Sequence, residues 1–170
     1  IRGLSEVASV LKLEVGCISQ DLTLSELRPP SLRFYLRGEG QHVFPLYQLL
    51  FNDLMQVAVV HPGFGRVKML GPAVVQPVGF ERDQGLLPYP PQAFIGYRLL
   101  SEFFASPQKF LFFDLTGLAD ALDGAGRKVE FYFYLRRNLA ELERKITHIT
   151  FALGCTPMVN LYQKRADPIQ

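Results

Sequence analysis

The sequence predicts an α+β fold, in which a mixed and largely antiparallel sheet carries packed helices. Short segments that alternate apolar and polar residues predict strands with one face toward solvent. Two longer segments, 41–55 and 92–105, repeat their apolar residues with the helical period. The order strand, strand, helix, strand occurs once in each half of the chain. Helices and strands that share such an order must pack on one another, as in α+β proteins.

The first half of the chain is predicted to hold most of the strands and one clear helix. In chain order the residues predict strands at 11–17, 32–36 and 56–60, a short helical turn within 21–30 and a helix at 41–55. Strands could also run at 66–70 and 73–78, but Pro72 and Pro77 favour edge positions or loops there. The apolar stripe of that helix consists of Val43, Tyr47, Leu50 and Leu54. Pro45 is tolerated because it falls in the first helical turn.

Residues 86–115 form the stretch around which the chain is organised. The prolines within 88–91 fix an extended segment, and helical spacing begins after them. The apolar arc of this helix consists of Ile95, Gly96, Leu99, Leu100, Phe103 and Phe104. Arg98, Ser101 and Glu102 share the narrow remainder, so the helix should be buried on most of its surface. Leu99, Leu100, Phe103 and Phe104 are therefore predicted to lie in the core.

The second half continues with a continuous apolar run at 110–115, which predicts a central strand with Phe110 and Phe112 buried. The remaining residues predict one helical turn at 118–122, a strand at 129–135, a short helix at 139–146 and a last strand at 147–153. The stripe of the short helix consists of Leu139, Leu142 and Ile146, and Asn138 is its expected N-cap.

The polar gap at 81–85 is the best candidate for a domain boundary. It would separate a first α+β lobe at 1–80 from a second lobe at 86–170 that includes the helix after the prolines. The repeated element order suggests two similar strand-strand-helix-strand lobes that arose by duplication. The helices at 41–55 and 138–146 would then occupy equivalent places on equivalent sheets. One continuous domain is the other reading, since α+β proteins often show this order.

Composition excludes several classes of partner. The formal net charge is +2 and lysines and arginines form no runs, so no nucleic-acid partner is predicted. No apolar run reaches the ~18 residues of a membrane span, so no direct membrane insertion is predicted. The two cysteines, Cys17 and Cys155, lie in apolar surroundings and are expected to be buried free thiols of a reducing compartment. A disulfide between them is the alternative.

The sequence offers little catalytic chemistry, and no catalytic residue, cofactor or metal site is predicted. His42, His61 and His148 lie on different elements without the spacing of metal ligands. The glycines of residues 63–65 lack the remainder of a phosphate-binding motif and indicate a turn. Asp114 has no visible acid–base partner, which favours a hydrogen-bonding role at the end of a strand. An enzyme domain with an unrecognised site is kept as an alternative.

Tyr35, Tyr132 and Tyr134 fall on the nominally outward faces of their strands. Outward aromatic side chains can form a platform that binds carbohydrate or peptide. The same tyrosines could instead lie under the helices that pack on one face of the sheet, and both readings stay open here.

Three long segments of the sequence are similar to segments of a known family: PYPPQAFIGYRLLSEFFASPQKFLFFDL at 88–115, SLRFYLRG at 31–38 and FALGCTPMVNLYQKRADPI at 151–169. Together they resemble the TssF family, also called ImpG or VasA, structural subunits of the bacterial type VI secretion baseplate. That family is several times longer, and the chain starts without Met, so we expect an internal fragment.

The resemblance implies a structural, non-enzymatic subunit of the baseplate wedge in a contractile machine akin to a phage tail. The implied partners are TssG, TssK, TssE, the VgrG spike hub and a second TssF copy. The implied location is the bacterial cytoplasm, at the cytoplasmic side of the inner membrane.

The last residues, 157–170, have neither helical nor strand periodicity yet carry several apolar side chains. Such a segment is too apolar for a free solvated tail, so it is expected to dock on a partner or to fold back on its own sheet. Asn160, Leu161 and Tyr162 are the predicted partner-binding residues.

Overall fold

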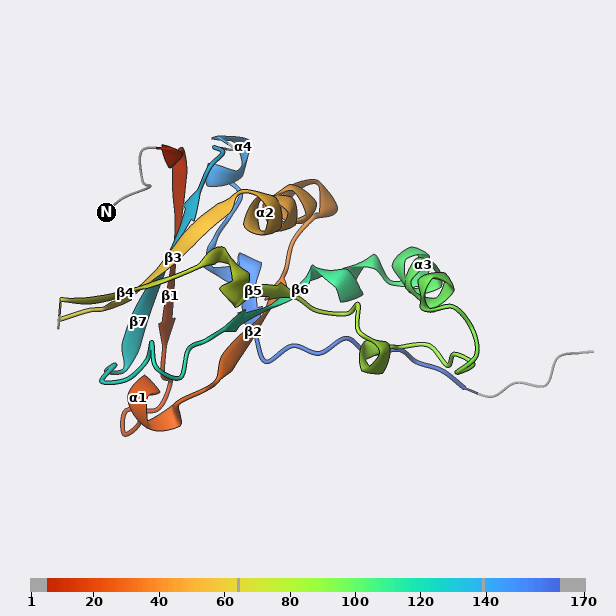
Figure 1. Ribbon diagram of the computed structural model, residues 1–170, viewed down its shortest axis with the longest axis horizontal. Helices are drawn as coiled ribbons and strands as arrows, with labels where there is room; N and C mark the ends of the chain where they lie inside the picture. Colours follow the sequence, from red (N-terminus) through yellow and green to blue (C-terminus); the bar gives the residue numbers. More distant parts are fainter. Residues whose placement is uncertain (1–5, 64, 139, 163–170) are drawn as a thin grey trace, which may run out of the picture.

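The fold is described by a computed structural model for residues 6–63, 65–138 and 140–162. Two four-stranded antiparallel sheets share one hydrophobic core, and short helices close its margins (Figure 1). The strands are β1 (Ser9–Gly16), β2 (Ser31–Leu36), β3 (Leu54–His61), β4 (Arg66–Leu70), β5 (Val75–Pro77), β6 (Phe112–Thr116), β7 (Lys128–Leu135) and β8 (Phe151–Leu153). The expected α+β class is confirmed.

The helices lie between these strands in the sequence. The α-helices are α1 (Leu24–Leu27), α2 (Gly40–Asn52), α3 (Ile95–Ala105) and α4 (Ala140–Glu143). The 3-10 turns are η2 (Pro72–Val74), η3 (Arg82–Gln84), η4 (Pro107–Leu111) and η5 (His148–Thr150). Figure 1 shows α2 against the core, whereas α3 lies away from both sheets at one end of the molecule.

The first sheet has the strand order β1-β7-β3-β4. Its central strand β7 alternates strictly, and Val129, Phe131 and Phe133 on its inner face are completely buried. This alternation fixes the register, because a shift by one residue would turn every phenylalanine of β7 toward solvent.

The second sheet has the order β5-β6-β2-β8. Its inner face is aromatic: the rings of Phe34 and Phe113 stack at 5.3 Å, and the ring of Phe151 meets both edge-on. Helix α2 completes the core with Val43, Leu46, Leu49 and Leu50.

Strand order contradicts the duplication hypothesis. Strand β7 of the second half lies between β1 and β3 of the first half, and β2 of the first half lies between β6 and β8 of the second. Both sheets therefore take strands from both sides of the gap at 81–85, so two similar lobes with equivalent sheets are not formed. Strands interleaved in this way do not separate into the predicted lobes at 1–80 and 86–170.

Several predicted elements are shorter than expected, and the segment 73–78 divides into η2 and the three-residue strand β5. The run 110–115 divides into the end of η4 and strand β6, although Phe110 and Phe112 are buried as predicted. The segment 147–153 likewise divides into η5 and β8, and the last helix is the four residues of α4. Leu139, from its predicted stripe, lies outside the described residues. Apolar content alone does not distinguish a buried 3-10 turn from a strand.

Both cysteines are free thiols, but they are not both buried. Cys17 is half-buried, whereas Cys155 is exposed, which corrects the expectation. Cys155 follows Gly154, whose φ of +70° turns the chain out of β8 and away from the core.

Candidate partner-binding surface

Helix α3 exposes its apolar residues and buries its charged ones. Arg98 and Glu102 are 4% and 1% exposed. Leu100 is 57% exposed and Phe104 is 81% exposed. The prediction that Leu100, Phe103 and Phe104 lie in the core is therefore wrong, and Leu99 is only partly buried. We call the exposed residues Tyr97, Leu100, Phe103 and Phe104 the outer face of α3.

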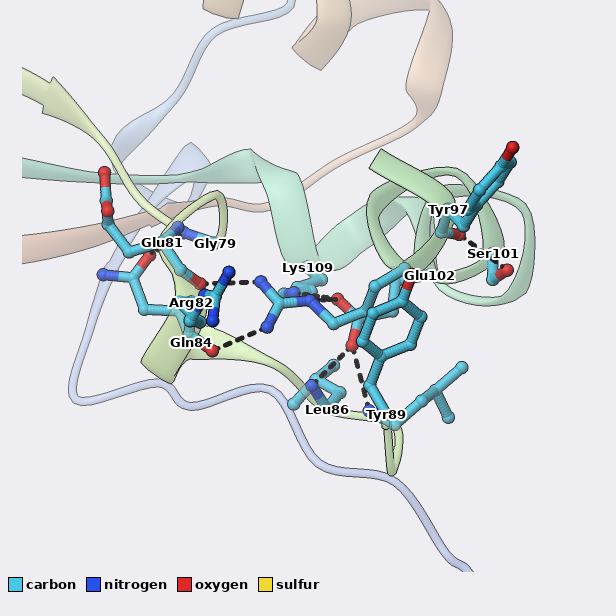
Figure 2. Close-up of polar contacts among 12 residues, drawn as sticks. Gly79, Glu81, Arg82, Gln84, Leu86, Tyr89, Tyr97, Ser101, Glu102 and Lys109 are labelled. Atoms are coloured by element: carbon cyan, nitrogen blue, oxygen red, sulfur yellow. Dashed lines mark hydrogen bonds and ion pairs between the residues drawn. The ribbon is translucent and has the colours of Figure 1, made fainter. Parts of the chain in front are cut away.

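A polar cluster formed by Arg98, Glu102 and Lys109 lies on the buried side of α3. Figure 2 shows Glu102 at its centre. One carboxylate oxygen of Glu102 accepts the backbone N–H groups of Leu86 at 2.7 Å and Leu87 at 2.9 Å. The other oxygen pairs with the ammonium group of Lys109, which is itself 2% exposed. Both oxygens of the buried Glu102 carboxylate thus have donors, as burial of a charged group requires.

Arg98 connects the same face of α3 to the chain that precedes it. Its guanidinium donates to the carbonyl oxygens of Arg82 at 2.6 Å and Glu81 at 2.7 Å. A side chain at Gly85 would place its Cβ 2.9 Å from the guanidinium, so glycine permits this approach. Residues 79–87 therefore cover the polar side of α3; we call them the covering segment.

The carboxyl group of Glu102 stays ionised despite its burial. Burial by itself raises the pKa of Glu102, but hydrogen bonds from the amides of Leu87 and Leu86 and the ammonium of Lys109 lower it. The net effect is a pKa below the ordinary value of 4.5. Glu102 is thus a buried carboxylate at neutral pH, and it faces the side chains of Arg98 and Lys109.

An apolar groove adjoins the outer face of α3. It encloses about 290 Å³ between α2, η4 and α3. Its lining consists of Phe44, Tyr47, Phe80, Leu99, Leu100, Phe103, Phe110 and Leu111. The hydroxyl of Tyr47 is the polar group of this set, and burial raises the pKa of Tyr47 to about 12, so it remains neutral. The groove offers no charge to a ligand.

The outer face of α3 is also uncharged. Arg98 and Glu102 are the charged residues of the helix, and the polar cluster holds both inside. The hydroxyl of Ser101 donates to the carbonyl of Tyr97 in its own helix. A contiguous exposed apolar surface of this kind is typical of a protein–protein contact.

The predicted partner-binding residues lie elsewhere, on the tail that follows β8. Asn160, Leu161 and Tyr162 are all exposed. Met158 is as exposed as Tyr162, so residues 158–162 do not fold back on their sheet. Figure 1 shows this tail leading toward the end of the molecule that carries α3. Ile169, also expected to contribute, lies outside the described residues.

Sequence reasoning placed the polar cluster on the wrong side of α3. The available signal was the spacing of Arg98 and Glu102, which are one turn apart in a helix with no other charge. Lys109 shortly after the helix and Gly85 before it complete the pattern. Opposite charges in isolation on a largely apolar helix are consistent with an internal ion pair as well as with a narrow solvated face.

The other candidate residues have structural partners. Arg33 donates two hydrogen bonds of 2.8 Å to Asp114 across the β2–β6 pair. One ring nitrogen of His61 lies 2.8 Å from the carbonyl of Ala121. Within the described residues, no group of three or more His, Cys, Asp or Glu side chains is placed to bind a metal ion. None of the described helices has the length and apolarity of a membrane span.

The three candidate tyrosines do not form one platform. Tyr35 belongs to the second sheet, whereas Tyr132 and Tyr134 belong to β7 of the first. All three are half-buried. Tyr132 donates to Glu130 at 2.7 Å, and the ammonium of Lys12 lies 5.6 Å from its ring centre. Neighbouring strands thus cover part of these rings.

A larger groove of about 690 Å³ follows β1 between the two sheets. It is lined by core side chains such as Leu46 and Phe151. Of its charged lining residues, Lys12 and Glu14 are paired with Glu130 and Lys128, each at 2.7 Å. Glu143 and His148 line the same groove.

Comparison with known proteins identifies the family. The sequence profile described as "Type VI secretion system, TssF" matches residues 2–170. Type VI secretion system component TssF1 of Pseudomonas aeruginosa is 34% identical over 140 residues, which cover 82% of this chain and 23% of the relative.

A solved structure agrees with the sequence comparisons. It is the TssK-TssF-TssG baseplate subcomplex of the type VI secretion system, determined by cryo-electron microscopy. One of its chains matches with a TM-score of 0.74 and 27% identity, covering 95% of this chain and 30% of that chain. The present chain spans less than a third of each relative. Since the family profile matches almost every residue, the chain belongs to the TssF family of the type VI secretion system.

Proposed function

We propose that this chain is part of a structural subunit of the type VI secretion baseplate wedge, and that it acts by protein–protein assembly without catalysis. The observation that carries this proposal is the exposed and uncharged outer face of α3, on the side of the helix opposite a buried polar cluster. An exposed apolar face of this kind favours a protein–protein contact.

The family supplies the partners. One relative belongs to a baseplate subcomplex with TssK and TssG, which supports both as partners of the full-length protein. The wedge would further contact TssE, the VgrG hub and a second TssF copy, at the cytoplasmic side of the inner membrane. These finer assignments rest on the resemblance of the sequence to the family.

We assign the outer face of α3 to TssG, the subunit with which, by the resemblance, the family works. The absence of charge on this face supports a contact with an apolar surface, because a partner that binds through salt bridges would find no counter-charge on it. Exposed aromatic residues such as Phe104 are enriched at the centre of such contacts.

Co-purification of the full-length protein with TssG tests this assignment. Leu100→Glu places a charge on the outer face and should weaken co-purification by at least about tenfold, because the charge would be desolvated in the contact. Val67→Glu is the matched control, since Val67 on β4 is also 57% exposed but lies outside α3. Equal co-purification of both variants with TssG would remove α3 from the contact.

We also propose that the tail residues Asn160, Leu161 and Tyr162 contact a neighbouring part of the wedge, either another TssF region or TssG. Their exposure supports this second contact, because exposed apolar groups on a segment without secondary structure gain most from a partner. Asn160→Ala combined with Tyr162→Ala should weaken wedge assembly while the melting temperature of this domain stays nearly unchanged. Normal assembly, or a large fall in melting temperature, would contradict the proposal.

A further inference from the structure

We infer that Arg98, Glu102 and Lys109 are positioning residues that fix the rotation of α3 about its own axis and so hold its uncharged face outward. The purpose of this orientation rests on the function proposed above, but the orientation itself can be tested without any partner.

The orientation of α3 is opposite to the usual preference of an amphipathic helix. A helix with a broad apolar arc normally packs that arc inward and leaves its charges in water. In α3 the arrangement is reversed, with Glu102 almost completely buried and Phe104 mostly exposed. Some interaction must therefore oppose the hydrophobic preference for the other rotation.

The polar cluster provides hydrogen-bond partners for backbone groups of the covering segment. Two backbone N–H groups, of Leu86 and Leu87, and two carbonyl oxygens, of Glu81 and Arg82, bond to the charged side chains of α3. Rotation of the helix would remove all four bonds and leave the backbone of the covering segment facing an apolar surface. Unpaired buried backbone groups are costly, so they oppose the rotation.

Lys109 lies in η4, which follows the C-terminal end of α3. Its ammonium pairs with Glu102 from η4, and its side chain is as buried as that of Glu102. The carboxylate is thus held between the covering segment and η4 (Figure 2). Contacts from two directions fix an angle, which one contact would not.

Buried ion pairs often add little net stability, because desolvation offsets their attraction. In this case the cluster does something that apolar residues of similar size would not do: it distinguishes one rotation of α3 from another. Replacing all three charges should therefore keep a folded protein but permit the apolar arc to turn inward.

Thiol labelling of the full-length protein, purified without TssG, measures the orientation. Phe104→Cys is the reporter, Cys17 and Cys155 are changed to serine, and labelling of the protein without the reporter is subtracted. With the native cluster, the reporter should react at the rate of an exposed thiol, because position 104 is 81% exposed.

The decisive variant combines Arg98→Leu, Glu102→Leu and Lys109→Met in the reporter protein. Labelling should slow by at least about tenfold as position 104 turns inward, a change equivalent to about 1.4 kcal/mol. Mere destabilisation would leave an exposed thiol equally reactive, so only reorientation slows it. Lys109→Arg, which keeps the charge, should leave the labelling rate unchanged.

Glu102→Gln is the second variant, for the case that the triple variant does not fold. It preserves side-chain shape but weakens the pairing with Lys109, and labelling should slow by at least about threefold. Native labelling rates in the folded triple variant, or in Glu102→Gln if the triple variant does not fold, would overturn the inference. That outcome is separate from failure of the docking proposal, which appears as normal TssG binding by Leu100→Glu.

Discussion

Helices α2 and α3 have similar lengths and similar patterns of apolar residues, yet they face opposite ways. In α2 the buried residues are Val43, Leu46, Leu49 and Leu50, whereas in α3 they are Arg98 and Glu102. The difference lies in what covers each helix. Helix α2 packs on the hydrophobic core, while α3 packs on the covering segment, which presents backbone polar groups.

This comparison shows that a helical period identifies which residues share a face but does not decide which face is inside. The surface that the helix meets decides it. A surface of side chains selects the apolar face, and a surface of unpaired backbone N–H and C=O groups selects the polar one.

The largest effect should come from breaking the polar cluster on one side only. Lys109→Met removes the nearer of the two cationic side chains that face the buried carboxylate of Glu102, which should lower the free energy of unfolding by about 3–5 kcal/mol. Urea unfolding of the 170-residue chain measures this value. A loss below about 1 kcal/mol would mean that the backbone bonds to Leu86 and Leu87 suffice.

The same leucine truncation in both helices sharpens the contrast. Leu46→Ala in α2 removes a core side chain that is 1% exposed and should cost about 2–5 kcal/mol of unfolding free energy. Leu100→Ala in α3 removes one that is 57% exposed and should cost less than about 0.5 kcal/mol, apart from the intrinsic helix preference for alanine. Similar losses at the two positions in equilibrium unfolding would show that the outer face of α3 is covered within this chain.

The smallest effect is the contribution of Glu102 to the dependence of stability on pH, which has no counterpart in α2 because that helix has no acidic residue. The folded pKa of Glu102 is lowered, so its contribution is complete above the ordinary value of 4.5 and is lost as pH falls through the lowered pKa. The charged groups facing it are Arg98 from α3 and Lys109 from η4.

Comparison of the native chain with the triple variant isolates this contribution. Between pH 6 and pH 3.5 (conditions on the order of one unit either side of the ordinary value), the native chain should lose more unfolding free energy than Arg98→Leu/Glu102→Leu/Lys109→Met. Equal losses in the two proteins would show that Glu102 is not the group that titrates.

Much of the fold follows from the sequence alone. Strand β7 was predicted because Val129, Phe131 and Phe133 alternate with polar residues, and this alternation admits one inward face. The helices α2 and α3 were predicted from their periods. These features depend on neighbours in sequence, which a single chain displays directly.

Only the tertiary structure decided the strand order and the facing of α3. The interleaving of β7 between β1 and β3 depends on pairing between residues that are 70 or more positions apart, which local patterns do not encode. The facing of α3 depends on Glu81, Arg82, Leu86 and Leu87, whose backbone groups are the same in any sequence. The physical reason is that backbone hydrogen-bonding needs are set by where the chain passes, and the residue letters do not record that path.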